Sequence, residues 1–431
     1  MKNRVLQLVA AMAVSTCAFA QTTVWNPAAN PDGTGNWNEA ANWTAGLPNP
    51  GSGKAVFNVP EAAPAIVSDE QSTFHLVQGD NADGGEIIIK SGGSLTLGEV
   101  WGGIGYNAKA VLTVETGGEM SFGQHAWIGF LEGAEGTVNI NGGTVSVAQM
   151  TGLGWEGGIG IVNLRDGLFD LANINATDLK SIGEGSYIDI SGGGVMTING
   201  NRLAHTDENE VEQPDQIAGF ADEGRILALG GNADLIYWYD AEADETFIVA
   251  PAIVESTFPL DLDTDISRDA DILIVFSKEM DAASVESNLT VSPAIDNQEL
   301  VWSETGDTLT IKGDLADGVT YAVSVTTDAV DLFGYGLAYD ESLSFTVEGE
   351  IAITLNADLE QGLSLFPNPT SEYFSFGSVA DEVKVFSIGG QLVLKETNVM
   401  NVRVDGLRSG QYLVKAQIDG QEISKKLIIK N

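Results

Sequence analysis

Three aromatic residues recur at nearly constant spacing in the middle of the chain. Tyr106, Phe130 and Trp155 each follow an Ile-Gly or Leu-Gly dipeptide, at intervals of 24 and 25 residues. If one interval is one turn of a repeating structure, the three rings lie one above another along an edge. Rings exposed in this way can bind the faces of sugar rings. The alternative, which we favour because large aromatic side chains are more often buried, is that the rings cover a corner or point inward and stabilise neighbouring repeats by stacking.

A group of acidic residues follows the last of these positions, in the fourth and fifth repeats. A pair of carboxylates can hydrolyse a glycosidic bond, and carboxylates beside an Arg or Lys base can cleave an acidic polysaccharide. The acidic residues are Asp166, Asp170, Asp178, Glu184 and Asp189. The basic residues of the same region are Lys90, Lys109, Arg165 and Lys180. Because the basic residues occupy no constant position and acidic residues are abundant throughout, a solvated surface is favoured, and we predict no catalytic residue.

Metal ligands are not indicated by the histidines. His75, His125 and His205 are scattered, and no two of them have the spacing of metal ligands. The acidic loop "HTDENEVEQPDQ" at 205–216 could hold a calcium ion, but a solvated loop is favoured. The sequence therefore predicts neither a metal site nor a cofactor.

The spacing of glycines predicts the framework that would carry these side chains. Five segments between residues 84 and 200 have a glycine between two stretches in which apolar and polar residues alternate. The glycines are Gly93, Gly118, Gly143, Gly167 and Gly193, at intervals of 25, 25, 24 and 26 residues. Alternation predicts strands, and the glycines predict corners with positive φ. Since one such unit cannot bury its apolar face alone, we predict an all-β protein with a β-solenoid at 84–200, in the form of a right-handed β-helix.

These units, such as "VLTVETGGEMSFGQHAWIGF", resemble the glycine-rich repeats of autotransporter-like and other exported bacterial surface proteins. Upstream, residues 21–83 contain the Trp- and Asn-rich "WNEAANWTAGLPN", which resembles the cap that precedes such repeats. Downstream, residues 201–250 are expected to supply closing strands. Caps are needed because an open end of a solenoid exposes an unpaired strand edge.

Residues 251–348 follow a different pattern. Alternating strands such as "DILIVFS" and "TYAVSVT", between turns that contain Asp and Gly, predict a sandwich of about 100 residues. The segments "FSKEMD", "LADGVTYAVSV" and "AVDLFGYGLA" resemble the bacterial Ig-like domain first described in S-layer proteins. Tyr335 departs from that family, which usually has Asn at this position. The resemblance implies a spacer or adhesive module and indicates no ligand.

The last seventy residues differ from the rest in charge. Residues 363–431 carry eight Lys and Arg against seven Asp and Glu, whereas residues 22–362 carry ten against fifty-four. After a linker at 349–362, "LFPNPT", "VFSIGGQLV", "LRSGQYLVK" and "KKLIIKN" resemble the C-terminal sorting domain of the type IX secretion system. The motif residues are Pro367, Asn368, Pro369, Gly389, Gly390, Gly410 and Tyr412. Hairpin patterns around 389–390 and 419–420 predict a small β-sandwich, and the resemblance implies that an outer-membrane translocon reads it.

The first twenty residues have the pattern of a signal peptide. Lys2 and Arg4 precede an apolar run that ends in a small-x-small sequence, so cleavage is predicted between Ala20 and Gln21. A lipoprotein signal ending at Cys17 is a less well matched alternative, because Thr16 stands where Gly or Ala is expected. Cys17 is the only cysteine, so a chain cut after residue 20 has no disulfide and no cysteine metal site.

Net charge argues against nucleic-acid binding, and hydropathy argues against an integral membrane protein. A net charge of −41 argues against nucleic acid, because phosphates are bound by Lys and Arg. After the signal peptide, no apolar run approaches the ~20 residues that span a bilayer, so an integral membrane protein is not expected.

Together these features predict an exported protein of the cell surface or the extracellular space. The predicted partners are signal peptidase, the type IX translocon and an extracellular or surface polysaccharide. The favoured function is a non-enzymatic structural or adhesive role, with the aromatic edge as the glycan contact. The alternative is a β-helix polysaccharide lyase or glycoside hydrolase with its site in the longer loops of the fourth and fifth repeats.

Overall fold

The computed structural model describes residues 21–26, 35–58, 64–171, 182–207, 211–349, 365–388, 390–418 and 421–430. The chain divides into two compact units between Glu348 and Gly349, and each is described by itself. The predicted signal peptide lies outside the described residues, and so does Ala20, so the cleavage site before Gln21 stays a prediction.

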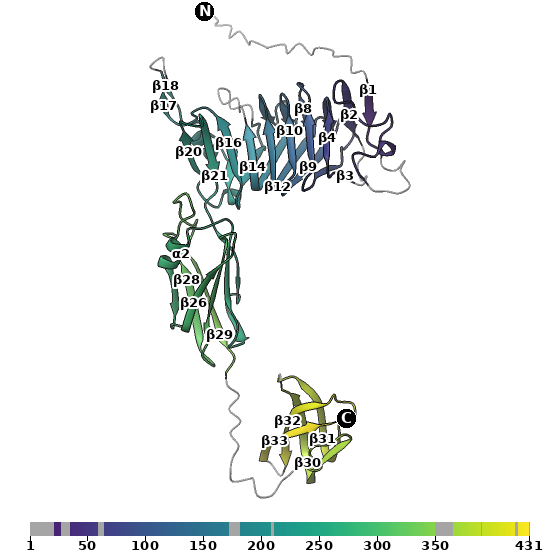
Figure 1. Ribbon diagram of the computed structural model, residues 1–431, viewed down its shortest axis with the longest axis vertical. Helices are drawn as coiled ribbons and strands as arrows, with labels where there is room; N and C mark the ends of the chain where they lie inside the picture. The colour runs from purple at the N-terminus through teal and green to yellow at the C-terminus, as the bar shows by residue number, and fades with distance from the viewer. Residues whose placement is uncertain are drawn as a thin grey trace, which may run out of the picture. The chain divides into compact units, whose positions relative to one another are not determined.

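The first unit begins with a β-solenoid in which strands from successive turns pair in parallel and form three ladders (Figure 1). The first ladder is a six-stranded sheet of β1 (Gln21–Val24), β2 (Gly53–Phe57), β5 (His75–Gln78), β8 (Gly102–Ile104), β11 (Ala126–Ile128) and β13 (Thr151–Leu153). The second contains β3 (Ala65–Val67), β6 (Glu86–Ile89), β9 (Lys109–Glu115), β12 (Glu135–Val147), β14 (Ile159–Leu171), β15 (Tyr187–Ile190) and β19 (Ile226–Ala228). The third contains β4 (Glu70–Thr73), β7 (Ser94–Leu97), β10 (Glu119–Phe122), the second halves of β12 and β14, β16 (Val195–Asn199), β21 (Glu245–Val249) and β20 (Ile236–Asp240).

Each turn of the solenoid therefore has three strands, one more than the sequence pattern predicts. The added strand is the short one of the first ladder, where residues 102–104, 126–128 and 151–153 were expected to form only a corner. The parallel ladders also begin before residue 84, since β2 pairs with β5 and β3 pairs with β6. The predicted all-β fold with a β-solenoid is confirmed.

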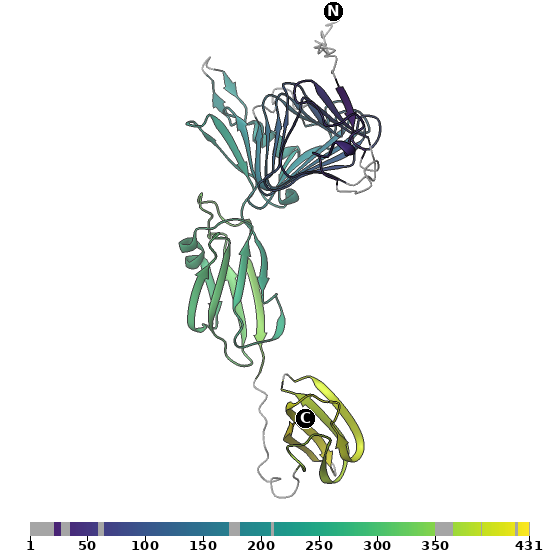
Figure 2. The same cartoon turned by 45° about the vertical axis from the view of Figure 1, so that its right-hand side comes forward.

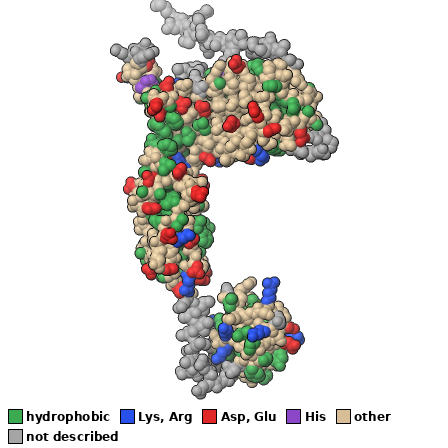
Figure 3. Space-filling view, in the orientation of Figure 1, with side chains coloured by type: hydrophobic (Ala, Val, Ile, Leu, Met, Phe, Trp, Pro, Cys, Tyr) green, Lys and Arg blue, Asp and Glu red, His purple; other side chains and the backbone are tan. Residues whose placement is uncertain are grey.

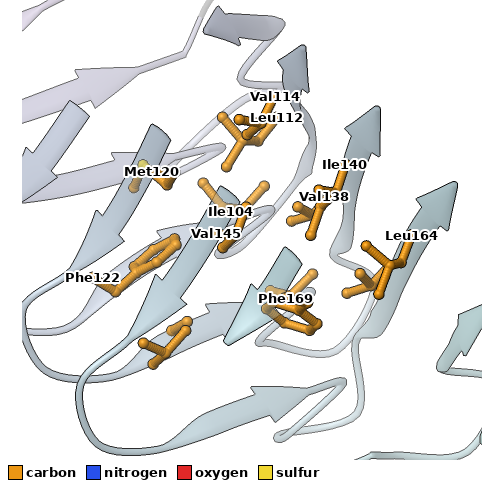
Figure 4. Close-up of a cluster of buried hydrophobic side chains, with 14 of the residues drawn as sticks. Ile104, Leu112, Val114, Met120, Phe122, Val138, Ile140, Val145, Leu164 and Phe169 are labelled. Atoms are coloured by element: carbon orange, nitrogen blue, oxygen red, sulfur yellow. The ribbon is translucent and has the colours of Figure 1, made fainter. Parts of the chain in front are cut away.

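Apolar side chains from the three ladders fill the interior of the solenoid. Figure 2 shows the strands around this core, and Figure 4 shows side chains from facing strands pointing into it, among them Phe122, Val138 and Phe169. These three side chains are 2%, 0% and 0% exposed. Because alternate residues of a strand point to opposite sides, the intervening residues lie on the outer surface.

Glycine pairs at the corners between the second and third ladders meet two different requirements. Gly92, Gly117, Gly142, Gly167 and Gly192, spaced by 25 residues, have positive φ. The prediction of positive φ is right for Gly167 and wrong for Gly93, Gly118, Gly143 and Gly193. Gly93, Gly118 and Gly143 instead lack the space for a side chain, as a Cβ at Gly143 would lie 2.5 Å from a methyl carbon of Val114. The first glycine of each pair is thus required by backbone conformation and the second by packing.

Substitutions at Gly92 and Gly93 separate these two requirements. A Cβ at Gly93 would lie 2.2 Å from the carbonyl oxygen of Val67, so we expect Gly93→Ala to lower the free energy of unfolding by about 2–4 kcal/mol. Open space surrounds Gly92, and Asn tolerates positive φ, so Gly92→Asn should cost less than about 1 kcal/mol. Denaturation followed by circular dichroism measures both losses, and equal losses would contradict the assignment.

Both ends of the solenoid are covered. At the first turn, Trp43 packs edge to face against Trp25, Trp37 and Phe57, and all four side chains are buried. At the last turn, β21 pairs antiparallel with β16, and β20 pairs antiparallel with β21. The remaining elements of this region are η2 (Ala40–Asn42), β17 (His205–Thr206), β18 (Glu212–Gln213), α1 (Gln216–Asp222) and η3 (Leu229–Gly231).

The first unit ends in a sandwich of two four-stranded sheets. One sheet has the order β22 (Val254–Phe258), β24 (Ile272–Phe276), β27 (Thr308–Asp314) and β26 (Asp296–Trp302). The other has the order β23 (Asp263–Ile266), β29 (Glu341–Val347), β28 (Thr320–Val325) and β25 (Leu289–Ser292), and α2 (Ala282–Asn288) precedes β25. A separate core that includes Phe276, Tyr321 and Phe345 holds the two sheets together.

Lys278 of the sandwich forms a largely buried ion pair and also contacts the residue that follows the last strand of the solenoid, β21. The Nζ of Lys278 donates to the carbonyl oxygen of Ala250 at 2.6 Å and lies 3.8 Å from a carboxylate oxygen of Asp331. The other oxygen of Asp331 accepts from the backbone N–H groups of Phe333 and Tyr335. The ring of Tyr335 packs at 5.6 Å from that of Trp238 in β20, so the residue that departs from the family pattern contacts the solenoid.

Lys278→Met tests this junction. The substitution would leave the carboxylate of Asp331, which is 1% exposed, without its cation. We expect the free energy of unfolding to fall by about 3–5 kcal/mol. Lys312→Met, at an exposed lysine of β27, is the control and should change it by less than about 0.5 kcal/mol. A loss at Lys278 no larger than at Lys312 would show that the pair contributes nothing.

The second unit is a four-stranded antiparallel sheet with the order β31 (Leu392–Arg403), β30 (Tyr373–Ser387), β32 (Gly410–Ile418) and β33 (Gln421–Ile429). The pairing of β30 with β31 is interrupted between Ser375 and Ala380. Side chains from both parts of β30, including Phe374 and Val385, therefore reach one core. The predicted hairpins are present, although Gly389, Asp419 and Gly420 lie outside the described residues.

Candidate functional site

The three predicted aromatic residues belong to a row of five rings on the outer surface of the first ladder. The row, called the aromatic row below, consists of Trp101, Tyr106, Trp127, Phe130 and Trp155. In β11, Ala126 and Ile128 belong to the solenoid core, so Trp127 between them points outward. Trp127 is buried beneath its neighbours, and the other four rings are partly exposed.

The rings of the row contact one another in sequence. Trp101 stacks on Tyr106 at 4.9 Å, and Tyr106 stacks on Phe130 at 5.1 Å with an angle of 6° between the planes. Trp127 contacts Phe130 at 5.2 Å and Trp155 at 5.5 Å, both in tilted arrangements. The stacking that was favoured from the sequence is therefore present, and it occurs on the outside of the sheet, where the rings keep an exposed side.

Two glycines leave the room that the rings occupy. Gly103 and Gly152 are the register partners of Trp127 on the neighbouring strands β8 and β13. A Cβ at Gly152 would lie 2.5 Å from the ring of Trp127, and one at Gly103 would lie 3.1 Å from Tyr106. Gly152 thus leaves room for the ring of Trp127 from the preceding turn, and Gly103 leaves room for the side chain of Tyr106 from its own turn.

Trp101 and Trp127 were missed in the sequence because they occupy different positions of the repeat. Trp101 is three residues before its Ile-Gly dipeptide, and Trp127 directly precedes Ile128. The sequence does contain a pattern that could have identified Trp127. When the repeats are aligned, Gly103, Trp127 and Gly152 occupy the same position. Such alternation of the largest and smallest residue across strands indicates a ring that lies over its neighbours.

Carboxylates flank the aromatic row. Burial raises the pKa of the Tyr106 hydroxyl, and the carboxylates of Asp80 and Glu156 raise it further. Asp80 is 3.6 Å from the Nζ of Lys54. Glu99, Glu132 and Glu156 are exposed. The surroundings of the row are therefore predominantly negative.

His75 lies at the end of the row, buried against Trp101. Its ring is 4.3 Å from that of Trp101, in an edge-to-face arrangement, and the side chain is 2% exposed. Burial lowers the pKa of His75 to about 3, and the positive charge of Lys54 contributes to this. Burial likewise lowers the pKa of His125, which contacts Trp127 at 5.7 Å. Both rings are thus neutral at pH 7.

The predicted group of carboxylates is spread over different surfaces of the solenoid. Asp189 accepts from the backbone N–H of Gly230 on the second ladder, and Asp166 accepts from Gly167 at a corner. Glu184 is exposed on a turn, and Asp178 lies outside the described residues. Asp170 accepts from Thr197 on the third ladder and lines a groove there with Ser121, Ser146, Asn199 and Glu245.

The basic residues of the repeats are paired locally. Lys90 is 3.1 Å from Glu115, Lys109 is 2.8 Å from Glu135, and Arg165 donates to Asn141 at 3.3 Å. Lys180 lies outside the described residues. Within the described ranges, no three His, Cys, Asp or Glu side chains are placed to hold a metal ion. The described part of the chain also contains no helix with the length and apolarity needed to cross a membrane.

The fold defines a multidomain β protein with two recognisable modules. Residues 248–347 match the family described as Bacterial Ig-like domain, and residues 364–430 match the Secretion system C-terminal sorting domain. The chain therefore carries a bacterial Ig-like domain and a type IX sorting domain beside its β-solenoid, and both resemblances are confirmed. The sorting domain marks secretion to the cell surface or the extracellular space, and with the Ig-like domain it fits a surface or structural role.

No curated protein sequence matches the chain. Among solved structures, the S-layer protein rSbsC(31-844) is similar at 17% identity and a TM-score of 0.18, over 42% of this chain and 26% of that one. Native alpha-2-macroglobulin from Escherichia coli is similar at 12% identity and a TM-score of 0.18, over 42% and 71%. The chain thus spans about a quarter of the length of the S-layer protein, and likenesses at these TM-scores carry no argument about function.

Titration of His75 gives a testable pH dependence. The folded pKa of about 3 lies below the ordinary value of 6.5, so below pH 6.5 the unfolded chain binds a proton that the folded chain does not. Stability from the neutral ring is complete above pH 6.5 and is lost as the pH falls toward 3. Between pH 7 and pH 4 the loss should be on the order of 3 kcal/mol.

The measurement is urea denaturation of the natural chain and of His75→Gln at both pH values. The variant cannot titrate at this position, so its unfolding free energy should fall less between pH 7 and pH 4. Since the other acidic and basic groups are common to both chains, the difference between the two losses isolates His75. Identical losses would show that His75 is protonated equally in the folded and unfolded chains.

Proposed function

We propose that this secreted protein is a non-enzymatic surface adhesin whose solenoid binds a neutral glycan at the aromatic row. The observation that supports the proposal is the position of four partly exposed rings on the outside of one rigid sheet. Aromatic side chains bury large areas on contact and lose little conformational freedom, so they suit the recognition of sugar faces. A parallel ladder holds the rings in fixed positions before the ligand arrives.

Trp155 is the ring best placed to contact a sugar. The faces of Tyr106 and Phe130 that point toward each other are covered by their mutual stacking at 5.1 Å. Trp101 is covered by Tyr106 on one side and by His75 on another. Among the described residues, Trp155 has one aromatic neighbour, Trp127, at a tilt of 46°. Tyr106 and Phe130 then contribute chiefly by supporting the row and through their exposed edges.

Charge favours a neutral glycan over an acidic one. The exposed carboxylates of Glu99, Glu132 and Glu156 belong to the loops around the row, and the chain as a whole has a net charge of −41. A uronic or sulfated sugar would be repelled by this field, whereas carboxylates can accept hydrogen bonds from neutral sugar hydroxyls. The proposed ligand is therefore an uncharged extracellular or surface polysaccharide.

A glycan array with the chain that begins at Gln21 tests the proposal. We expect binding to neutral glycans, and Trp155→Ala should weaken it by about tenfold or more. Tyr187→Ala is the matched control, because Tyr187 is a partly exposed aromatic residue of the second ladder, and it should bind as the natural chain does. The triple variant at Tyr106, Phe130 and Trp155 should not bind.

Two results would overturn the proposal. Release of reducing ends from a bound glycan would establish an enzyme, for which the groove that contains Asp170 and Glu245 would be the place to examine. Absence of binding to any glycan, with the chain folded, would leave a structural surface role.

A further inference from the structure

The sorting domain carries an apolar pocket of about 430 Å³. Phe386 lines it from the end of β30, Ile388 from the turn that follows, and Tyr412 and Leu413 from β32. Lys415 and Lys426 also line it. Ile388 is 85% exposed, which makes it the most exposed of the large hydrophobic residues that the structure describes. Ile388 adds nothing to the core, and with the other apolar residues of the pocket it forms a continuous apolar surface of the kind that marks an interaction site.

The sequence motifs of the sorting domain, which lie far apart in the chain, meet at this pocket. Gly390 and Tyr412 line it directly. Gly410 is close to the ring of Tyr412, since a Cβ there would be 3.7 Å from a ring carbon. Asn368 supports the neighbouring strand, because its side chain donates to the carbonyl oxygen of Lys426 at 2.7 Å and accepts from Ile428 at 2.8 Å. Gly389 lies outside the described residues.

The charge around the pocket differs from that of the first unit, which is strongly acidic. Figure 3 shows acidic side chains over the visible face of the first unit and Lys and Arg over that of the second. The export machinery must recognise a surface of the sorting domain itself, whatever domains precede it in the chain. An apolar pocket with two ammonium groups is complementary to a segment that combines a large apolar side chain with carboxylates.

We propose that this pocket is the surface by which the export machinery recognises the sorting domain. The proposed occupant is a protein segment of that machinery that inserts an apolar side chain between Ile388 and Tyr412 and places a carboxylate near Lys426, which is exposed. The inference rests on export through the sorting domain and adds the place and the chemistry of recognition.

Export in a bacterium with a type IX system provides the test, using the full chain. Ile388→Asp introduces a negative charge at the mouth of the pocket without removing a core contact. Val379→Asp is the matched control, because Val379 is a 52% exposed apolar residue of β30 that does not line the pocket. Lys426→Glu tests the charge. The fractions in the medium, on the cell surface and in the periplasm are measured by immunoblot.

We expect Ile388→Asp and Lys426→Glu to reduce the exported fraction by about tenfold or more, with full-length protein retained in the periplasm. Val379→Asp should be exported normally, and all three purified variants should melt at the temperature of the natural chain. Normal export of both pocket variants would overturn the proposal. Normal export followed by loss of surface attachment would also overturn it, and would assign the pocket to an anionic surface lipid. A chain without residues 349–431 must fail to be exported, because its export would show that the sorting domain is not the address at all.

Discussion

The parallel pairing of backbone from one solenoid turn to the next is the interaction on which the rest of the first unit depends. Each strand of an inner turn obtains its hydrogen-bond partners from the turns on both sides, so the chain needs no disulfide to hold an extended structure together. The same pairing fixes the register, so that residues about 25 positions apart are neighbours in space. Each residue of one turn therefore lies beside the residue at the equivalent position of the next turn.

The aromatic row follows from this constraint. Rings that recur in register must stack, and stacking both stabilises adjacent turns and covers part of each ring. The glycines opposite Trp127 show that this packing is specific, since any side chain at Gly152 would meet the indole ring. A surface built in this way is rigid, and only its ends and outer edges are free for a ligand.

The two units carry their charge differently, which agrees with the different partners proposed for them. The solenoid and the Ig-like domain hold nearly all of the acidic residues, which suits a protein that works in contact with solvent and other surfaces. Within this unit, Lys278 and Tyr335 connect the Ig-like domain to the final solenoid strand. The sorting domain is nearly neutral in net charge and presents an apolar pocket with lysines, which suits recognition by another protein.

The sequence by itself determined the features that depend on local pattern. Alternating residues and a 25-residue glycine repeat were enough for the all-β solenoid, and the motifs of the last seventy residues were enough for the sorting domain. Only the tertiary structure decided which residues become neighbours across strands. The short strand at 126–128, the position of Trp127 over Gly152, and the meeting of Gly390 with Tyr412 all arise from pairing between distant segments. Local periodicity does not encode such pairing, because it is set by register and by the packing of neighbouring turns.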